Sequence, residues 1–186
     1  KLVGTEEKTD KRPIYKLAAP ELIGSIANVG SAKAFDLENC LGAEPDLVIL
    51  PKKAKDYAKT LNEMGIAAVV VNPESHEALV DMIKLIANLT GSEETAGKLI
   101  TSYNEVLSKV ESATANLDDS KKPVVYMCNN STYLATAPKD MYQASLVRSV
   151  GGKNAGDILE GDSWTDVSYE QILTMTPDII IIPTNN

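Results

Sequence analysis

The sequence predicts an α/β fold of two lobes with parallel sheets, joined by one long α-helix. Three observations predict it. Strands alternate with helices along the chain, an uninterrupted amphipathic helix occupies Ser92–Leu117, and a helix–Pro-Asp–strand pattern occurs once on each side of that helix. We therefore expect an N-terminal lobe over residues 1–91, a connecting helix over 92–117 and a C-terminal lobe over 118–186.

The long helix is predicted from the spacing of its apolar residues. They recur at intervals of three, four and seven, as on one buried helical face: Ala96, Leu99, Ile100, Tyr103, Val106, Leu107, Val110 and Ala113. Ser92 is suited to cap the N-terminus, and Glu93 and Glu94 suit the positive end of the helix dipole. At 1.5 Å per residue the helix would span roughly 35 Å.

The repeated pattern lies in residues 36–51 and 168–183. Each copy predicts a short helix with a glutamate in its first turn, then Pro-Asp, then a buried apolar strand that ends in proline. The two glutamates are Glu38 and Glu170. Taken singly, each glutamate could have no role beyond a favourable interaction with the positive end of its helix dipole. As a pair on matching lobes, they would form two acidic knobs that suit arginine pockets on a symmetric partner.

The remaining elements follow from apolar runs and capping signals. Short, fully apolar runs predict strands that are covered on both faces, and strands are expected at Lys1–Gly4, Leu47–Leu50, Ala67–Val71, Pro123–Cys128, Tyr133–Thr136 and Ile179–Ile182. Helices are expected at Leu37–Ala43 with Asp36 as N-cap, at Asp56–Met64, from Asn72–Ser75 to Leu89, and at Met141–Val150. Gly151-Gly152 ends the last of these, and Ser168 with Gln171 forms a capping box.

Composition narrows the function. The net charge of −8 and pI of about 4.7 argue against nucleic acid and anionic lipid as partners. Cys40 and Cys128 are far apart in the sequence, so neither a disulfide framework nor a zinc site is expected. His76 is the only histidine and is expected to be exposed, which argues against a histidine-rich metal site. No phosphate-binding or dinucleotide-binding glycine motif is present, so we expect no cofactor, no metal site and no catalytic residues.

Candidate ligand-binding residues lie just beyond predicted strands. Ligands of open α/β folds bind at the carboxyl ends of strands, and the candidates there or close by are Lys52, Lys53, Asn129, Tyr133, Tyr142, Trp164 and Thr184. Trp164 is the only tryptophan. It would either pack beneath a loop or stack on a ligand.

Motifs in both halves resemble the class III substrate-binding proteins of ABC importers, which carry ferric siderophores, haem or cobalamin. The N-lobe signature is represented by Val29-Gly30, Leu37-Glu38 and Pro45–Ile49. The C-lobe signature is represented by Val150–Asn154, by Trp164-x-x-Val167-Ser168-x-Glu170 and by Pro177–Ile180. The motifs keep their order and spacing over nearly the whole chain.

The resemblance implies two Rossmann-like lobes joined by one long helix, with the ligand in the cleft between them. In this family a glutamate on each lobe docks on arginines of the membrane permease, and the matching positions are Glu38 and Glu170. It also implies an extracytoplasmic location, periplasmic or as a cell-surface lipoprotein, and we expect a monomer. The family's opening strand would precede Lys1 and its last C-lobe units would follow Asn186, so we expect a chain truncated at both ends.

A ferric siderophore is the expected ligand. Siderophore binders of the family often use arginines, tyrosines and tryptophans against an anionic or aromatic chelate, and here the lysines and aromatic residues named above could serve. Haem and cobalamin remain alternatives within the same fold. An α/β enzyme with its site between the lobes and a ligand-sensing domain of a larger signalling protein are the alternatives from other functional classes.

Overall fold

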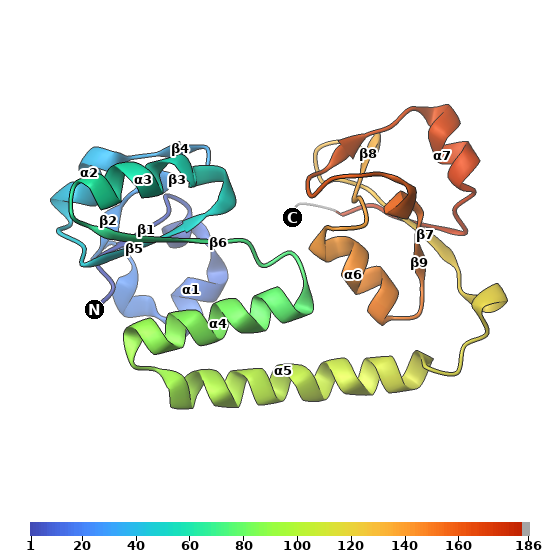
Figure 1. Ribbon diagram of the computed structural model, residues 1–186, viewed down its shortest axis with the longest axis horizontal. Coiled ribbons are helices and arrows are strands. Elements are labelled where there is room, and N and C mark those ends of the chain that lie inside the picture. The colour runs from blue at the N-terminus through green and yellow to red at the C-terminus, as the bar shows by residue number, and fades with distance from the viewer. Residues whose placement is uncertain (184–186) are drawn as a thin grey trace. The chain divides into compact units, whose positions relative to one another are not determined.

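The computed structural model, which describes residues 1–183, divides into two compact units, Lys1–Asn72 and Pro73–Asn186 (Figure 1). Both units combine helices with short parallel sheets, which confirms the predicted α/β class. Each unit has its own hydrophobic core. Thr184, one of the predicted ligand-binding residues, lies outside the described residues.

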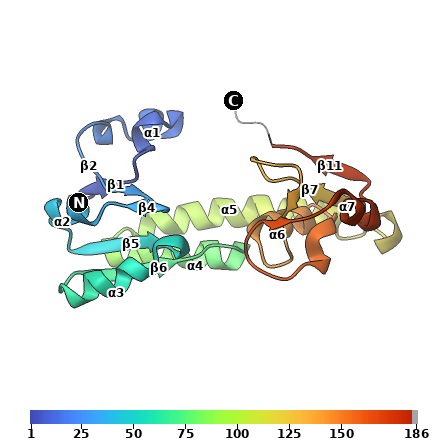
Figure 2. The same ribbon diagram turned by 90° about the horizontal axis from the view of Figure 1, so that it is seen from above.

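The first unit contains two separate parallel pairs of strands. Its strands are β1 (Gly4–Thr5), β2 (Ala27–Asn28), β3 (Gly30–Ser31), β4 (Ala34–Phe35), β5 (Leu47–Pro51) and β6 (Ala67–Val71). β1 pairs with β2 and β5 pairs with β6, both in parallel, whereas β3 and β4 form an antiparallel pair (Figure 2). Its helices are α1 (Pro13–Ala18), α2 (Leu37–Gly42) and α3 (Asp56–Glu63). The core forms where β5 meets α2 and α3, around Cys40, Leu50 and Leu61.

The second unit contains a three-stranded parallel sheet in the order β11-β7-β9 and an antiparallel pair, β8 with β10. Its strands are β7 (Val124–Met127), β8 (Ala135–Thr136), β9 (Lys153–Asn154), β10 (Thr165–Asp166) and β11 (Ile179–Ile181). Its helices are α4 (His76–Thr90), α5 (Glu93–Thr114), α6 (Tyr142–Ser149) and α7 (Tyr169–Met175). Tyr126, Cys128 and Met175 lie at the centre of its core.

The predicted caps of the two repeated helices are confirmed. Asp36 accepts a hydrogen bond from the backbone N–H of Asn39 at 2.9 Å and so caps α2. Ser168 accepts from the N–H of Gln171 at 3.2 Å, and the Gln171 side chain accepts from the N–H of Ser168 at 2.8 Å. These bonds satisfy N–H groups that a helix start leaves unpaired.

The long helix differs from its prediction in two respects. Ser92 does not cap α5 through its side chain; its hydroxyl bonds to the hydroxyl of Thr90 at 2.5 Å. The packed face is also narrower than the apolar pattern, because Leu99 and Val106 are 56% and 59% exposed. Helix α5 contacts α4 and α6, and those contacts cover only part of its apolar stripe.

The strand β11 was expected to be buried, and among the described residues it is not. The four consecutive isoleucines of residues 179–182 are between 41% and 64% exposed. β11 is the edge strand of its sheet and pairs only with β7 among residues 1–183. An apolar run therefore predicted the strand correctly but not its environment.

Two glycines should respond in opposite ways to a methyl group. Gly97 lies inside α5, and a Cβ there would meet no atom within 4 Å. Gly97→Ala should stabilise the protein by about 0.5–1 kcal/mol, because alanine loses less backbone entropy in a helix. A Cβ at Gly156 would lie 2.1 Å from the carbonyl oxygen of Ala137, so Gly156→Ala should destabilise by about 1–3 kcal/mol. Urea denaturation of both variants tests this, and a shift of the same sign in both would contradict it.

Candidate functional site

The two predicted lysines follow β5 of the first unit, in which buried residues alternate with exposed ones instead of being covered throughout as the sequence predicted. Lys52 and Lys53 lie in the 3-10 turn Lys52–Ala54, directly after β5, and both are exposed. Ala54 of the same turn is buried in the core and anchors it. The strand thus ends in two cations at its carboxyl end, as the sequence predicted.

Asn129 has the corresponding place in the second unit, just beyond β7. Its backbone N–H donates to the carbonyl oxygen of Ala135 at 2.9 Å, and its side-chain oxygen accepts from the N–H of Ser131 at 2.8 Å. These two bonds close the loop of residues 129–135. Asn129 therefore shapes this loop, and its side-chain oxygen is already engaged.

The same loop presents Tyr133, which the structure pairs with a residue that the sequence analysis did not single out. The hydroxyl of Tyr169, the first residue of α7, lies 3.2 Å from the hydroxyl of Tyr133. Both side chains are more than half exposed, and their ring centroids are 6.3 Å apart. The hydrogen bond with Tyr133 raises the pKa of Tyr169. The pair offers two aromatic faces and two hydroxyls to solvent.

A buried tyrosine holds this loop from below. Tyr126 of β7 is 1% exposed, and its hydroxyl donates to the carbonyl oxygen of Tyr133 at 2.8 Å. Burial is the main cause that raises the pKa of Tyr126 to about 12, and the neighbouring Cys128 thiol contributes to the same shift. The hydrogen bond links the core of the second unit to the exposed tyrosine pair.

Tyr142 lies elsewhere in the second unit, in a cluster that sequence reasoning missed. Its backbone N–H donates to the Glu74 carboxylate at 3.1 Å, and its ring packs edge-on against His76 at 5.5 Å. His76 Nδ1 bonds to the Tyr103 hydroxyl, and its Nε2 lies 3.1 Å from the Ser149 hydroxyl. Burial and the adjacent Tyr142 raise the pKa of Tyr103 to about 12.

His76 is therefore not the exposed histidine that we expected. It is half-buried and connects the start of α4 to both α5 and α6. No local sequence signal indicates this role, because the partners lie 27 and 73 residues away along the chain.

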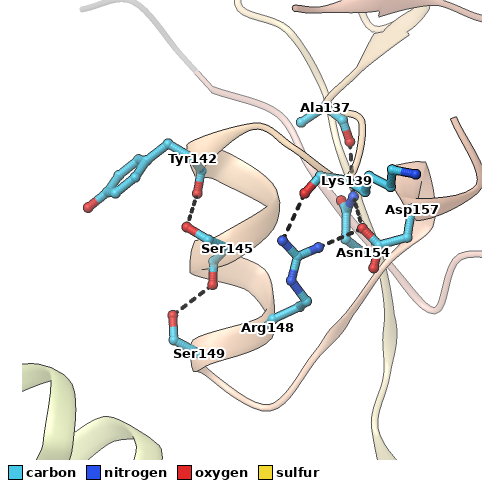
Figure 3. A network of polar contacts seen from close by, with 8 residues as sticks. All are labelled: Ala137, Lys139, Tyr142, Ser145, Arg148, Ser149, Asn154 and Asp157. Atoms are coloured by element: carbon cyan, nitrogen blue, oxygen red, sulfur yellow. Dashed lines mark hydrogen bonds and ion pairs between the residues drawn. The ribbon is translucent and has the colours of Figure 1, made fainter. Parts of the chain in front are cut away.

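A network of polar contacts fixes the segment before α6. Arg148 of α6 donates to the Asp157 carboxylate at 2.7 Å and to the carbonyl oxygen of Lys139 at 2.9 Å. The side chain of Asn154 donates to Asp157 and to the carbonyl oxygen of Ala137, both at 2.9 Å. Figure 3 shows the Tyr142 ring projecting away from this network, on the other side of α6. Arg148 is thus engaged within the fold.

Trp164 and Tyr133 lie at opposite ends of the short ladder formed by β8 and β10. Thr165 pairs with Thr136 and Asp166 pairs with Ala135 in antiparallel register. Tyr133 precedes one strand and Trp164 precedes the other, so the antiparallel register separates them. Trp164 is half-buried. The predicted ligand-binding residues that the structure describes in the second unit therefore fall at three places: the loop after β7, the start of α6 and the start of β10.

Glu38 and Glu170 occupy equivalent positions in the two repeated helices. Each is exposed and is the second residue of a helix whose side-chain cap was described above. Its own backbone N–H and the Ser168 side chain lower the pKa of Glu170. Each unit thus presents a carboxylate at a capped helix start, followed by Pro-Asp and a parallel strand.

Cavities in the two units differ in their lining. A cavity of about 520 Å³ in the first unit lies between β1 and β5. A cavity of about 380 Å³ in the second unit is lined by charged and hydroxyl side chains, among them Glu111, Lys122 and Arg148. Within residues 1–183, no predicted ligand-binding residue lines either cavity.

Cys40 and Cys128 are both free and buried, and burial raises the pKa of each thiol. Among residues 1–183, no three histidine, cysteine or acidic residues form a group that could hold a metal ion. In the same part of the chain, no helix is long and apolar enough to cross a membrane.

Comparison with known proteins places these features in context. The family model described as periplasmic binding protein matches residues 1–186. The cobalamin-binding protein of Halobacterium salinarum is 24% identical over 84% of this chain and 42% of its own length. The petrobactin-binding protein YclQ of Bacillus subtilis is 25% identical over 84% of this chain and 49% of its own. The chain thus spans about half the length of these curated relatives.

A solved structure agrees with the fold. The periplasmic solute-binding protein of Veillonella parvula is 30% identical and superposes with a TM-score of 0.72 over 97% of this chain and 55% of that one.

The Tyr126 phenol should make stability fall at alkaline pH. The folded protein holds its proton more tightly than the unfolded chain, in which a tyrosine has a pKa of about 10. Its contribution is therefore complete below pH 10 and is lost as the pH rises through about 12. Between pH 10 and 12, Tyr126→Phe should lose less stability than the wild type. At pH 7 the variant should be about 1 kcal/mol less stable, because it lacks the bond to Tyr133. Urea denaturation followed by circular dichroism measures both, and equal alkaline losses would contradict the assignment.

Proposed function

The chain belongs to the periplasmic binding protein family, and from this premise we propose that it is the extracytoplasmic solute-binding component of an ABC importer. In this proposal it captures a metal chelate and delivers it to the membrane permease. Its role is binding and not catalysis. Its relatives support this proposal, because they are named as binding proteins. A lipid anchor at the cell surface is part of the proposal for the whole protein, as is its action as a monomer.

The pair of equivalent glutamates carries the docking part of the proposal. Glu38 and Glu170 are exposed, and each is the second residue of a capped helix, so the backbone fixes the point from which each side chain projects. An arginine guanidinium binds a carboxylate through two parallel hydrogen bonds. Two such carboxylates, one in each unit, suit a permease with two equivalent arginine pockets.

The proposed ligand is a ferric siderophore. Its anionic groups would be met by Lys52 and Lys53, and its aromatic or amide parts by the exposed ring of Tyr133. Asn129, Tyr142, Trp164 and Thr184 complete the proposed set of binding residues. The petrobactin-binding relative supports this class of ligand.

Cobalamin is the second candidate, because the Halobacterium relative is named for it, and haem remains a third. Both would need aromatic contact surface, and aromatic residues make up only 5% of this chain. That composition favours the siderophore.

Fluorescence of the single tryptophan offers a direct test of ligand class. The complete mature protein is titrated with a ferric catecholate, a ferric hydroxamate, haem and cyanocobalamin. Saturable quenching by a ferric chelate alone is expected. Trp164→Phe should lose the optical signal and bind the same chelate more weakly in calorimetry, because Trp164 belongs to the proposed binding set. Saturation by haem or cobalamin alone would replace the siderophore with that ligand. If none of the four ligands changes the fluorescence or gives a heat of binding, the proposal is wrong.

Removal of both carboxylates should separate docking from ligand capture. Glu38→Ala with Glu170→Ala should reduce uptake in cells at least tenfold and leave ligand affinity within twofold, because neither residue belongs to the proposed ligand set. Glu93→Ala with Glu94→Ala removes two first-turn acids of α5 and serves as the matched control, with normal uptake expected. A parallel loss of ligand affinity in the double variant, or equal uptake in both double variants, would contradict the docking role.

A further inference from the structure

The side chain of Tyr133 is held by a residue outside the proposed set of binding residues. Tyr169, the first residue of α7, donates its hydroxyl hydrogen to the hydroxyl oxygen of Tyr133 across 3.2 Å. The two rings are tilted by 44° and their centroids are 6.3 Å apart, so the closest approach of the pair is at the hydroxyl groups. The contact joins residues that lie 36 positions apart in the sequence.

The backbone around Tyr133 is fixed as well. Its carbonyl oxygen accepts a hydrogen bond from the hydroxyl of the buried Tyr126 at 2.8 Å. The next residue, Leu134, donates its N–H to Thr132 Oγ1 at 3.1 Å and accepts from the N–H of Val167 at 2.9 Å. Val167 is 6% exposed and belongs to the core of the second unit. The loop that carries Tyr133 is therefore tied to that core.

Tyr169 stands on an equally fixed backbone. It lies between Ser168 and Gln171, which form the capping box of α7 through bonds of 3.2 Å and 2.8 Å. The box sets the first turn of the helix and the direction in which Tyr169 leaves it. Two anchored segments thus meet through their tyrosine side chains. A side chain that is already held loses less conformational freedom when a ligand binds to it, which raises the affinity.

The direction of the hydrogen bond leaves a donor available on Tyr133. A tyrosine hydroxyl has one hydrogen to donate and an oxygen that accepts. Tyr169 gives its hydrogen to Tyr133, and this bond raises the pKa of Tyr169 because it stabilises the protonated phenol. Within residues 1–183 the Tyr133 hydroxyl has no other hydrogen bond, and the residue is 56% exposed. Its hydrogen is therefore available to an acceptor that arrives from solvent.

We propose that Tyr169 is a positioning residue of the ligand site, which holds the Tyr133 phenol so that the Tyr133 hydroxyl donates to an oxygen of the bound ferric chelate. The inference rests on the proposed function, in which Tyr133 contacts the siderophore. Catecholate and hydroxamate oxygens carry negative charge, and a hydrogen bond to a charged acceptor is about twice as strong as one between neutral groups. Tyr169 acts through Tyr133 and does not itself contact the ligand.

Calorimetry on the complete mature protein tests this role. The probe is the ferric tris-catecholate or tris-hydroxamate that saturates the wild type. Tyr169→Phe keeps the ring and removes the hydroxyl, and it should weaken binding about fivefold because Tyr133 is no longer held. Tyr133→Phe should weaken binding about tenfold because the donor itself is lost. Tyr57→Phe removes a hydroxyl from the first unit and is the matched control, with an affinity within about twofold of the wild type.

The double variant distinguishes positioning from direct contact. If Tyr169 acts through Tyr133, adding Tyr169→Phe to Tyr133→Phe should change the affinity by less than about twofold. A further loss of about fivefold would mean that Tyr169 binds the ligand independently, and it would overturn the positioning role. Equal binding by the wild type and Tyr169→Phe would overturn it too. If the wild type binds neither chelate, the proposed function is wrong, and this inference is wrong with it.

A spectroscopic measurement without ligand tests the hydrogen bond itself. Tyrosines are labelled with ¹³C at Cζ, and the ionisation of each is followed by NMR. In Tyr133→Phe the pKa of Tyr169 should fall towards the ordinary value of about 10, because the acceptor that holds its proton is gone. Tyr126 should keep its pKa of about 12, which reports an intact core. An unchanged pKa of Tyr169, or an equal fall at Tyr126, would overturn the positioning role.

Discussion

Parallel pairing of very short strands is the constraint on which both units depend. β5 and β6 pair over five residues and β7 with β11 over three. The turn at Lys52 begins where β5 ends, and the loop of residues 129–135 follows β7. Because hydrogen bonding fixes the register, it also fixes where the chain leaves the sheet. Lys52 and Asn129 are placed by this register. The core beneath them, around Leu50 and Leu61 in one unit and Tyr126 in the other, holds the strands in place.

Capping hydrogen bonds place the acidic positions with comparable precision. An exposed glutamate on a long flexible side chain has little defined geometry by itself. At Glu38 and Glu170, a hydrogen bond between the residue two positions before and the residue one position after caps the helix and fixes its first turn, and the glutamate is the second helical residue in each case. The equivalence of the two positions therefore lies in the backbone as well as in the repeated sequence.

Much of the secondary structure was predictable because its signals are local. The strands at 47–51 and 67–71 and the helices capped by Asp36 and Ser168 each carry their apolar run, cap or stop within a few residues. Burial was less predictable. Leu99, Val106 and the isoleucines of residues 179–182 carry apolar patterns and yet are exposed, because burial depends on what packs against an element and not on its own period.

Some features of the candidate site could likewise be predicted from the sequence, and others could not. The sequence alone determined the two acidic helix starts, the lysines after β5 and the family resemblance, since each depends on residue order and spacing. Only the tertiary structure decided that Tyr169 joins Tyr133, that Trp164 lies at the other end of its ladder, and that His76 joins three helices. Such contacts join residues tens of positions apart, and only the folded backbone brings them within hydrogen-bonding distance.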